Sequence, residues 1–272
     1  MLQADRSARL AEARLYFVCE ARPPSAPLDV LLAAALRGGV DVFQLREKHL
    51  PDEAILEAAR VARELCLAAG ALLIINDRPD LAVAADADGV HVGQDDMGVD
   101  AARAVVGPER IVGLSTHSPA QINAAGAAAD MIGVGPIYPT PTKLYRPAVG
   151  LELIAYAREN ARQPFFAIGG IDEVKAVEVA AAGAGRIAVV RAIASAGDPE
   201  AAARALRSAA QTTPLPELEA VSRIGAGSET AGSWRQATGG SAADAGGIGK
   251  GSAGVCRREA AGSESATRET AS

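Results

Sequence analysis

The stretch VDVFQLREKHLPDEAILEAARVARELCLAAGALLIIN, residues 40–76, contains one complete strand–helix–strand unit. It begins with an apolar, β-branched run, Val40–Leu45, and ends with a second apolar run, Ala71–Asn76. The Ala-rich segment between them, Asp52–Ala69, has the amphipathic pattern of a helix. A strand, a helix and a second strand in this order predict parallel pairing through a right-handed crossover.

The same alternation continues on both sides of this unit, up to about residue 211. Further strands are predicted at Leu15–Cys19, Gly89–Val92, Arg110–Ser115, Met131–Ile137, Pro164–Ile168 and Arg186–Val190. Further helices are predicted at Leu28–Arg37, Arg78–Ala85, Val99–Val106, Pro119–Ala128, Leu151–Ala161, Ile171–Ala182 and Pro199–Ala209. Eight strands in strict alternation with eight helices predict an α/β fold of the (β/α)8 TIM barrel type. An open doubly wound sheet is the alternative, and it is less favoured because no GxGxxG motif follows the first strand.

The composition excludes several classes of protein. The chain has 272 residues, of which 49% are hydrophobic, and a formal net charge of −6, which argues against a general nucleic-acid or anionic-membrane binder. Its three cysteines form no CxxC pair, so neither a disulfide framework nor a cysteine zinc site is expected. Residues 1–20 lack the apolar core of a signal peptide, and no run reaches the roughly 18 apolar residues of a membrane span. A cytoplasmic location is therefore expected.

The character of the chain changes after Thr212. From Gly225 onward Gly, Ser, Ala and Thr dominate, with no sustained hydrophobic period. Such a segment buries too little apolar area to offset the entropy that ordering it would cost. The sequence therefore predicts a catalytic barrel domain over residues 1–212 and a disordered, low-complexity tail over residues 213–272.

Polar side chains follow the apolar run of the second predicted strand. Gln44, Arg46 and Lys48 alternate along the chain, so they are expected to point to the same face. Three hydrogen-bond donors at the carboxyl end of a strand suit a highly charged anion such as a diphosphate. An ordinary solvated strand end is the alternative. In a barrel the carboxyl ends of all strands line one mouth, where the candidate groups of different strands come together.

Two acids, Asp77 and Asp96, follow the third and fourth predicted strands, so their carboxylates are expected to meet at this mouth. Two hard oxygen ligands suit Mg²⁺, which takes its other ligands from water and substrate phosphates. Each acid alone is more often a helix N-cap, but the neighbouring cations favour the metal site. The histidines His49, His91 and His117 match no metal spacing, and none is assigned as a general base. His91 is expected within the fourth strand, facing the core or the helix layer.

Two further segments have the composition of phosphate sites. The loop after the sixth strand contains Thr140, Thr142 and Lys143, stiffened by two prolines, and hydroxyls with an ammonium group suit phosphate oxygens. A rigid surface loop is the alternative. The pair Gly169-Gly170 opens a helix after the seventh strand, where backbone N–H groups and the helix dipole bind phosphate. Phosphate sites after the seventh and eighth strands are usual in this fold.

Together these motifs closely resemble those of the thiamine-phosphate synthase family. The resemblance rests on QLREK (44–48), INDR (75–78), GVHVGQDD (89–96), GVGPIYPTPTK (133–143) and AIGGI (167–171), in this order. It covers about residues 13–210, which is the whole predicted barrel.

The resemblance implies a (β/α)8 transferase of thiamine biosynthesis that uses Mg²⁺ and two small-molecule substrates, with no nucleic-acid or membrane partner. Such an enzyme joins hydroxymethylpyrimidine diphosphate to thiazole phosphate by a dissociative substitution, and it releases pyrophosphate. The implied diphosphate contacts are Gln44, Leu45, Arg46, Glu47, Lys48, Asn76, Ser115 and Lys143, with catalytic roles for Arg46, Lys48 and Lys143. The implied Mg²⁺ ligands are Asp77 and Asp96. The implied thiazole-phosphate contacts are Thr140, Pro141, Thr142, Gly170, Val190 and Arg191.

The chain departs from the family pattern at two positions. Arg191 stands where many members have Ser, and His49 stands where a small residue is expected. If the phosphate contact at position 191 is a backbone N–H, any side chain is tolerated. If the contact is the serine hydroxyl, Arg191 must replace it with a charged donor.

Two other functions fit parts of the pattern. A thiazole tautomerase is a related barrel that would keep the phosphate glycines without needing Arg46, Lys48 and both aspartates together. A non-catalytic sensor of phosphate ligands would bind without releasing pyrophosphate. The sequence leaves the oligomeric state open.

Overall fold

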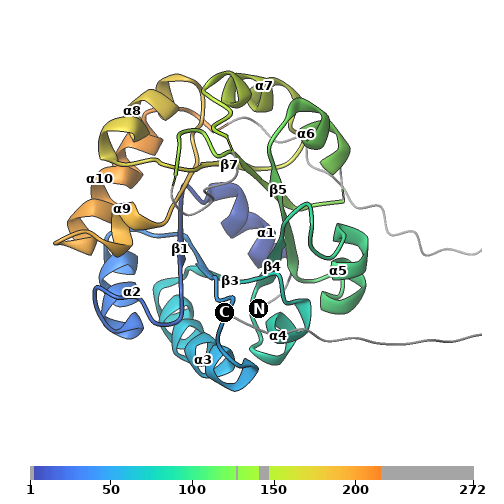
Figure 1. Ribbon diagram of the computed structural model, residues 1–272, viewed down its shortest axis with the longest axis vertical. Helices are drawn as coiled ribbons and strands as arrows, with labels where there is room; N and C mark the ends of the chain where they lie inside the picture. Colours follow the sequence, from blue (N-terminus) through green and yellow to red (C-terminus); the bar gives the residue numbers. More distant parts are fainter. Residues whose placement is uncertain (1–2, 127, 141–146, 216–272) are drawn as a thin grey trace, which may run out of the picture. The chain divides into compact units, whose positions relative to one another are not determined.

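The computed structural model of this chain describes residues 3–126, 128–140 and 147–215. Eight parallel strands close into a single barrel in which each strand pairs with the next and the last pairs with the first (Figure 1). The strands are β1 (Leu15–Cys19), β2 (Val42–Leu45), β3 (Leu72–Asn76), β4 (Gly89–Val92), β5 (Ile111–Thr116), β6 (Met131–Val134), β7 (Phe165–Ile168) and β8 (Ile187–Val189). The prediction of a (β/α)8 barrel is confirmed.

A ring of helices surrounds the barrel (Figure 1). These helices are α2 (Leu28–Arg37), α3 (Asp52–Ala69), α4 (Pro79–Ala84), α5 (Val99–Val106), α6 (Pro119–Ala125), α7 (Glu152–Asn160), α8 (Glu173–Ala181) and α10 (Pro199–Gln211). Among the described residues, two helices were not predicted. One is α1 (Gln3–Glu12), which precedes β1, and the other is α9 (Arg191–Ala194), which directly follows β8.

Strand β6 ends three residues before its predicted end at Ile137. Pro136 has no N–H group with which to continue a strand ladder. The N–H groups of Ile137 and Tyr138 instead donate to the carbonyls of Ile168 and Gly169, at 2.9 and 3.0 Å. The chain that leaves β6 is therefore fastened to the end of β7, close to the mouth of the barrel.

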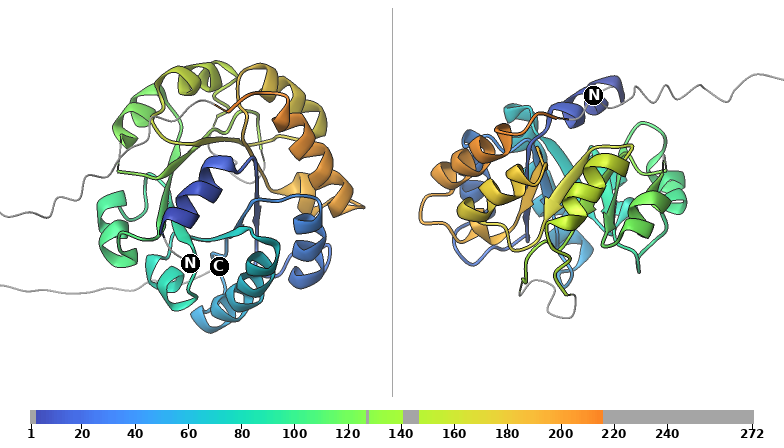
Figure 2. Two further views of the ribbon diagram at one scale, coloured as in Figure 1. Left: turned by 180° about the vertical axis from the view of Figure 1, so that it is seen from behind. Right: turned by 90° about the horizontal axis from the view of Figure 1, so that it is seen from above.

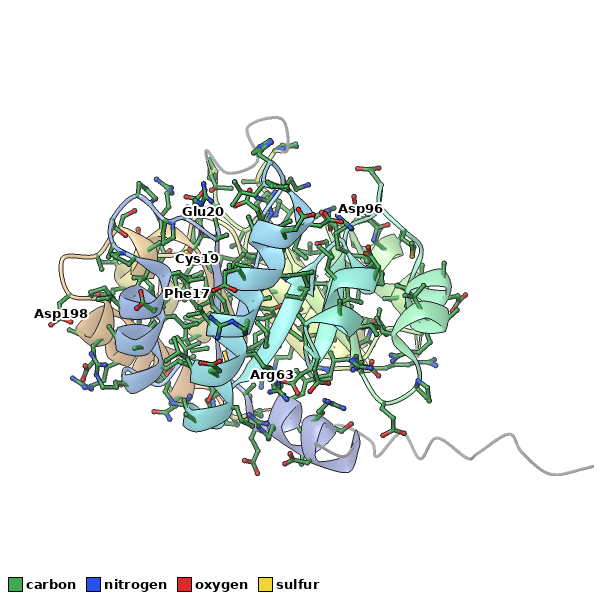
Figure 3. All side chains as sticks on the ribbon, turned by 90° about the horizontal axis from the view of Figure 1, so that it is seen from below. Phe17, Cys19, Glu20, Arg63, Asp96 and Asp198 are labelled. Atoms are coloured by element: carbon green, nitrogen blue, oxygen red, sulfur yellow. The ribbon has the colours of Figure 1, made fainter. Side chains whose placement is uncertain are left out.

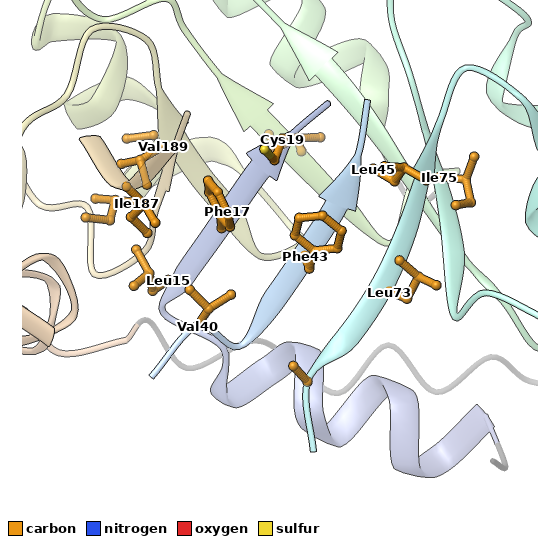
Figure 4. Packing of buried hydrophobic residues seen from close by; sticks show 14 of the residues in the cluster. Leu15, Phe17, Cys19, Val40, Phe43, Leu45, Leu73, Ile75, Ile187 and Val189 are labelled. Atoms are coloured by element: carbon orange, nitrogen blue, oxygen red, sulfur yellow. The ribbon is translucent and has the colours of Figure 1, made fainter. Parts of the chain in front are cut away.

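Alternate residues of each strand point into the barrel or outward to the helices, as the pleat requires. Figure 4 shows part of the outward layer, in which Phe17, Phe43 and Leu45 pack with their neighbours. The inward apolar side chains form a separate cluster that includes Tyr16, Val18, Val42, Leu72, Ile74, Met131 and Phe166. Because this pattern holds through the barrel, a residue whose two strand neighbours belong to the outward cluster points into the barrel.

Three aspartates lie at the amino-terminal ends of the strands, opposite the mouth. Asp41, Asp88 and Asp130 immediately precede β2, β4 and β6, and each carboxylate accepts a backbone N–H from the neighbouring strand. The N–H donors are Leu15, Leu73 and Val112. The ion-pair partners of the three acids are Arg207 for Asp41, Arg6 and Arg63 for Asp88, and Arg103 for Asp130. These acids therefore stabilise the starts of the strands.

Helix α1 covers this amino-terminal end of the barrel (Figure 2). Its Arg6 is only 5% exposed, and the Nε of Arg6 donates to Asp88 at 3.0 Å. The carbonyl of Ala11, also in α1, accepts a hydrogen bond from the guanidinium of Arg186 at 2.7 Å. A buried ion pair and a buried guanidinium thus fix α1 across the end of the barrel that lies away from the mouth.

The packed part of the chain extends past the predicted boundary at residue 212. Thr213 is buried, and its hydroxyl donates to the carbonyl of Ala180 at 2.6 Å. Its own carbonyl accepts a hydrogen bond from Arg14 at 2.9 Å. A tail that begins at residue 213 would therefore include a residue that bonds to the barrel.

We expect a chain ending at Leu215 to keep the urea midpoint of the full chain, and a chain ending at Thr212 to lose about 1–3 kcal/mol of unfolding free energy. The reason is that the second truncation leaves the Arg14 guanidinium and the Ala180 carbonyl each without one hydrogen bond. Equilibrium urea unfolding of the three chains measures this difference. Equal midpoints for the two truncated chains would show that Thr213 contributes nothing.

Helices of membrane-spanning length and hydropathy do not occur within the described ranges.

Candidate active site

The two acids predicted to share a metal ion lie close together at the carboxyl ends of the strands. Asp77 directly follows β3 with a left-handed backbone, φ 60°, and its N–H donates to the carbonyl of His91 at 2.8 Å. Asp96 lies in the loop after β4 and accepts the N–H of Gly93 at 3.0 Å. The carboxylate of Asp96 is close enough to that of Asp77 to raise its pKa. Figure 3 shows Asp96 at the end of the barrel opposite Arg63.

The charges around Asp77 are unbalanced. Burial raises the pKa of the Asp77 carboxyl, and the charge of Asp96 with its side-chain hydrogen bond raises this pKa further. The ammonium of Lys48, 3.3 Å from Oδ2 of Asp77, lowers the pKa by less than these effects raise it. Two carboxylates held together in this way would be stabilised by further positive charge.

The inward-facing residues at the ends of β2 and β3 border the acid pair. Gln44 is 5% exposed and donates from Nε2 to the hydroxyl of Tyr16 at 2.8 Å. Arg46, half-buried, is anchored by its backbone N–H, which donates to the carbonyl of Cys19 at 2.8 Å. Asn76 is 8% exposed, and its Nδ2 has no hydrogen-bond partner among the described residues. This amide is thus a donor available to a bound molecule.

Two residues of the QLREK motif have side chains that contact other parts of the protein. Leu45 is 1% exposed and packs in the outward apolar layer. The carboxylate of Glu47 accepts the backbone N–H groups of Lys48 and His49, at 2.8 and 3.0 Å. Leu45 and Glu47 therefore hold the strand and its loop in place.

A cavity of about 440 Å³ opens beside this cluster, between β1 and the strands from β4 to β8. Its inner wall is apolar and includes Tyr16, Met131 and Phe166. Its polar lining includes Gln44, His91, Ser115, Thr140 and Arg191. An apolar enclosure with a few polar groups is the usual form of a small-molecule site.

The glycines after β7 allow a close approach of the loop that follows β6. Gly169 and Gly170 have φ values of 106° and 66°, which residues with a side chain rarely adopt. A Cβ on Gly169 would lie 2.5 Å from Pro136, and one on Gly170 would lie 2.8 Å from the Pro139 carbonyl. The sequence indicated that these glycines admit a ligand. They also allow the chain to pack against itself, and both line the cavity.

The two residues at the end of β8 that the sequence predicts as phosphate contacts lie at the cavity. Val190 and Arg191 line the cavity, and Arg191 is the first residue of α9. The first backbone N–H groups of a helix have no partner within the helix, so they can donate to a ligand. A backbone contact at position 191 is therefore compatible with arginine in place of serine.

The loop after β6 is described only in part. Thr140 lines the cavity, whereas Pro141, Thr142 and Lys143 lie outside the described residues.

Two histidines that the sequence did not assign to the site line the cavity. His91 lies in β4 and faces the barrel interior, with Nε2 3.0 Å from Oγ of Ser115. The ring of His117 contacts the carbonyl of Gly135 through Nδ1. The sequence contained a signal for His91, because Val90 and Val92 on either side are apolar and fully buried in the outward layer.

A closed parallel barrel with a cavity at the carboxyl ends of its strands has the form of a (β/α)8 enzyme, because active sites of this fold lie at that mouth. The family model described as thiamine monophosphate synthase matches residues 15–193. The chain therefore belongs to the thiamine monophosphate synthase family.

Individual relatives agree with this assignment. A thiamine-phosphate synthase of Gloeobacter violaceus is 50% identical over 196 residues, covering 72% of this chain and 57% of the relative. A thiamine-phosphate synthase of Acidothermus cellulolyticus is 50% identical over 199 residues, covering 72% of this chain and 94% of the relative. The chain thus spans little more than half of the first relative and nearly all of the second.

Solved structures show the same fold. Thiamine phosphate pyrophosphorylase from Pyrococcus furiosus superposes with a TM-score of 0.69 at 32% identity, covering 75% of this chain and 98% of that one. A 3-hexulose-6-phosphate synthase superposes with a TM-score of 0.52 at 22% identity, covering 72% of this chain and 99% of that one. The second similarity concerns the barrel fold alone.

Proposed function

We propose that this chain is a thiamine-phosphate synthase, which joins hydroxymethylpyrimidine diphosphate to thiazole phosphate and releases pyrophosphate. The observation that carries the proposal is the contact of Asp77 with both Asp96 and Lys48, beside a cavity of about 440 Å³. A site with acids and a cation together suits a metal-bound diphosphate. Family membership and the names of the relatives support the same activity.

The two substrates are proposed to occupy different parts of the mouth. The diphosphate would bind on the side of β2, β3 and β5, through Gln44, Arg46, Lys48, Asn76 and Ser115, with backbone groups of Leu45 and Glu47. The thiazole phosphate would bind on the side of β7 and β8, through Gly170, Val190 and Arg191, with Thr140. Pro141 and Thr142, which follow Thr140 in the chain, belong to the proposed thiazole-phosphate contacts, and Lys143 belongs to the proposed diphosphate contacts.

Asp77 and Asp96 are proposed to hold Mg²⁺. The residues fit this ion, because two contacting carboxylates with a raised Asp77 pKa would be stabilised by a divalent cation. Within the described ranges no group of three or more His, Cys, Asp or Glu could hold a metal, so the other ligands would come from the diphosphate and water. When bound, the ion would neutralise charge on the departing pyrophosphate.

The residues of the chain would assist a dissociative substitution. The bond between the pyrimidine methylene and the diphosphate oxygen breaks, and its electron pair leaves with pyrophosphate. The thiazole nitrogen then donates its electron pair to the methylene carbon. Arg46 and Lys48 would hold the departing pyrophosphate. The enclosed cavity would orient the two rings and limit the access of water to the pyrimidine-methyl cation. This path requires no protein nucleophile.

A single assay tests the proposal against its rivals. Purified protein is incubated with both substrates, with and without Mg²⁺, and pyrophosphate and thiamine phosphate are measured. Release of both products that requires Mg²⁺ and both substrates is the expected result. Isomerisation of the thiazole alone would identify a tautomerase, and binding without product would identify a sensor.

A further inference from the structure

His91 is placed inside the barrel by the alternation of β4. Its neighbours Val90 and Val92 are fully buried in the outward layer, so the imidazole between them points inward. The ring is half-buried and lines the cavity. His91 is thus a polar side chain on the inner face of β4. Its partner in the register of the neighbouring strand β3 is Asn76, which is also polar.

The barrel leaves space for this imidazole at two glycines. Gly113 of β5 lies directly across from His91, and a Cβ on Gly113 would lie 2.5 Å from Nδ1 of the ring. Gly133 of β6 lies next along the inner face, and a Cβ there would lie 3.6 Å from Cε1. The ring therefore extends across two strands that have no side chain at these points. Any larger residue at position 113 would occupy the space that the His91 ring fills.

The far end of the ring reaches Ser115. Nε2 of His91 lies 3.0 Å from Oγ of Ser115, and both side chains line the cavity. A serine hydroxyl has one hydrogen, so it can donate to an anion only when it accepts its other hydrogen bond. If Ser115 binds the diphosphate, as the proposed function requires, the imidazole must therefore be the donor between the two.

We propose that His91 is a positioning residue for the pyrophosphate-binding hydroxyl of Ser115. In this arrangement Nε2–H of His91 donates to Oγ of Ser115, and the hydroxyl hydrogen is directed to an oxygen of the diphosphate. The inference rests on the proposed function, and it adds a residue that acts through Ser115 without touching the substrate. A serine activated as a nucleophile would require the reverse bond, with Nε2 accepting the hydroxyl hydrogen.

The test compares two amides of different length at position 91. In His91→Gln the amide nitrogen reaches about as far as Nε2 of the imidazole, whereas in His91→Asn it falls short of Ser115. We expect His91→Asn to weaken the binding of inorganic pyrophosphate, measured by calorimetry in the presence of Mg²⁺, by about tenfold. The reason is that the Ser115 hydroxyl, no longer oriented by Nε2–H, loses its hydrogen bond to the charged pyrophosphate. We expect His91→Gln to retain most of the affinity. Thermal unfolding checks that each variant is folded.

A double-mutant cycle shows whether His91 acts through Ser115. We expect Ser115→Ala to weaken pyrophosphate binding and the double variant His91→Asn/Ser115→Ala to bind no more weakly than Ser115→Ala alone. Gly113→Ala should mimic His91→Asn by displacing the ring. Gly197→Ala is the matched control, because a Cβ at Gly197 meets nothing within 4 Å.

Three results would overturn the inference. These are losses that add in the double variant, an unchanged pyrophosphate affinity in His91→Asn, and nitrogen chemical shifts that show His91 protonated at Nδ1 alone. Unchanged affinity together with abolished turnover would indicate a nucleophilic serine instead. Calorimetry measures binding without turnover, so a wild-type protein that makes no thiamine phosphate would refute the proposed function and still leave the His91 inference testable.

Discussion

Asp96→Asn is expected to lower kcat/KM for pyrophosphate release on the order of 100-fold or more, without lowering the stability of the barrel. The activity falls because one of the two proposed Mg²⁺ ligands loses its charge. The stability is kept or raised because Asp96 is one of the groups that raise the Asp77 pKa, and its neutralisation relieves repulsion between the two carboxylates. A loss of activity with equal or higher thermal stability distinguishes a functional acid from a structural one.

The measurements are initial rates over a range of Mg²⁺ concentrations and thermal unfolding in the absence of the metal. Part of the lost activity should return at high Mg²⁺, because the remaining ligand Asp77 still binds the ion. Asp95→Asn, one residue earlier in the same exposed loop, is the control for a lost negative charge. A folded Asp96→Asn protein with the rate and Mg²⁺ dependence of the wild type would refute the metal role.

The barrel was predictable because each strand and helix carried its own local pattern. Helix α1 was missed because Gln3–Glu12 mixes charged and short apolar pieces, and its fold depends on Arg6 finding Asp88, 82 positions away in the chain. Helix α9 was missed because four residues are too few to show a helical period. Thr213 was assigned to the tail because the contacts that bury it are also distant in sequence.

The placement of the candidate site residues was predictable where their position along a strand decides it. Asp88 precedes β4 and Asp96 follows it, so the first belongs to the amino-terminal end of the barrel and the second to the mouth. Residue type alone does not separate them. The facing of the first QLREK side chains followed from the alternation, as Gln44 at the cavity and Leu45 in the outward layer show. The contact of His91 with Ser115 was not predictable, because it depends on two glycines in other strands that make room for the ring.

The second large effect is expected at the opposite end of the barrel. Asp88→Asn should reduce the free energy of unfolding by about 3–5 kcal/mol, a large share of the stability of an ordinary domain. The Asp88 side chain is fully buried, with Oδ1 accepting from Arg6 at 3.0 Å and Oδ2 from the N–H of Leu73 at 2.9 Å. Asparagine leaves the buried guanidinium of Arg6 without its counter-charge.

Asp86→Asn is the matched control, since the Asp86 side chain is 69% exposed although it also pairs with Arg63 and Arg110. An exposed pair contributes about 0–1 kcal/mol, so this variant should unfold close to the wild type in urea. Adding Arg6→Met to Asp88→Asn should restore part of the lost stability, because it removes the uncompensated buried charge while keeping most of the apolar volume of the side chain. The ion pair lies at the end of the barrel away from the mouth, so kcat/KM of the folded Asp88→Asn protein should stay near the wild-type value. Two results would show that the buried pair does not hold α1 in place. One is an equal loss of unfolding free energy in Asp86→Asn and Asp88→Asn, and the other is an Arg6→Met/Asp88→Asn variant that is less stable than Asp88→Asn alone.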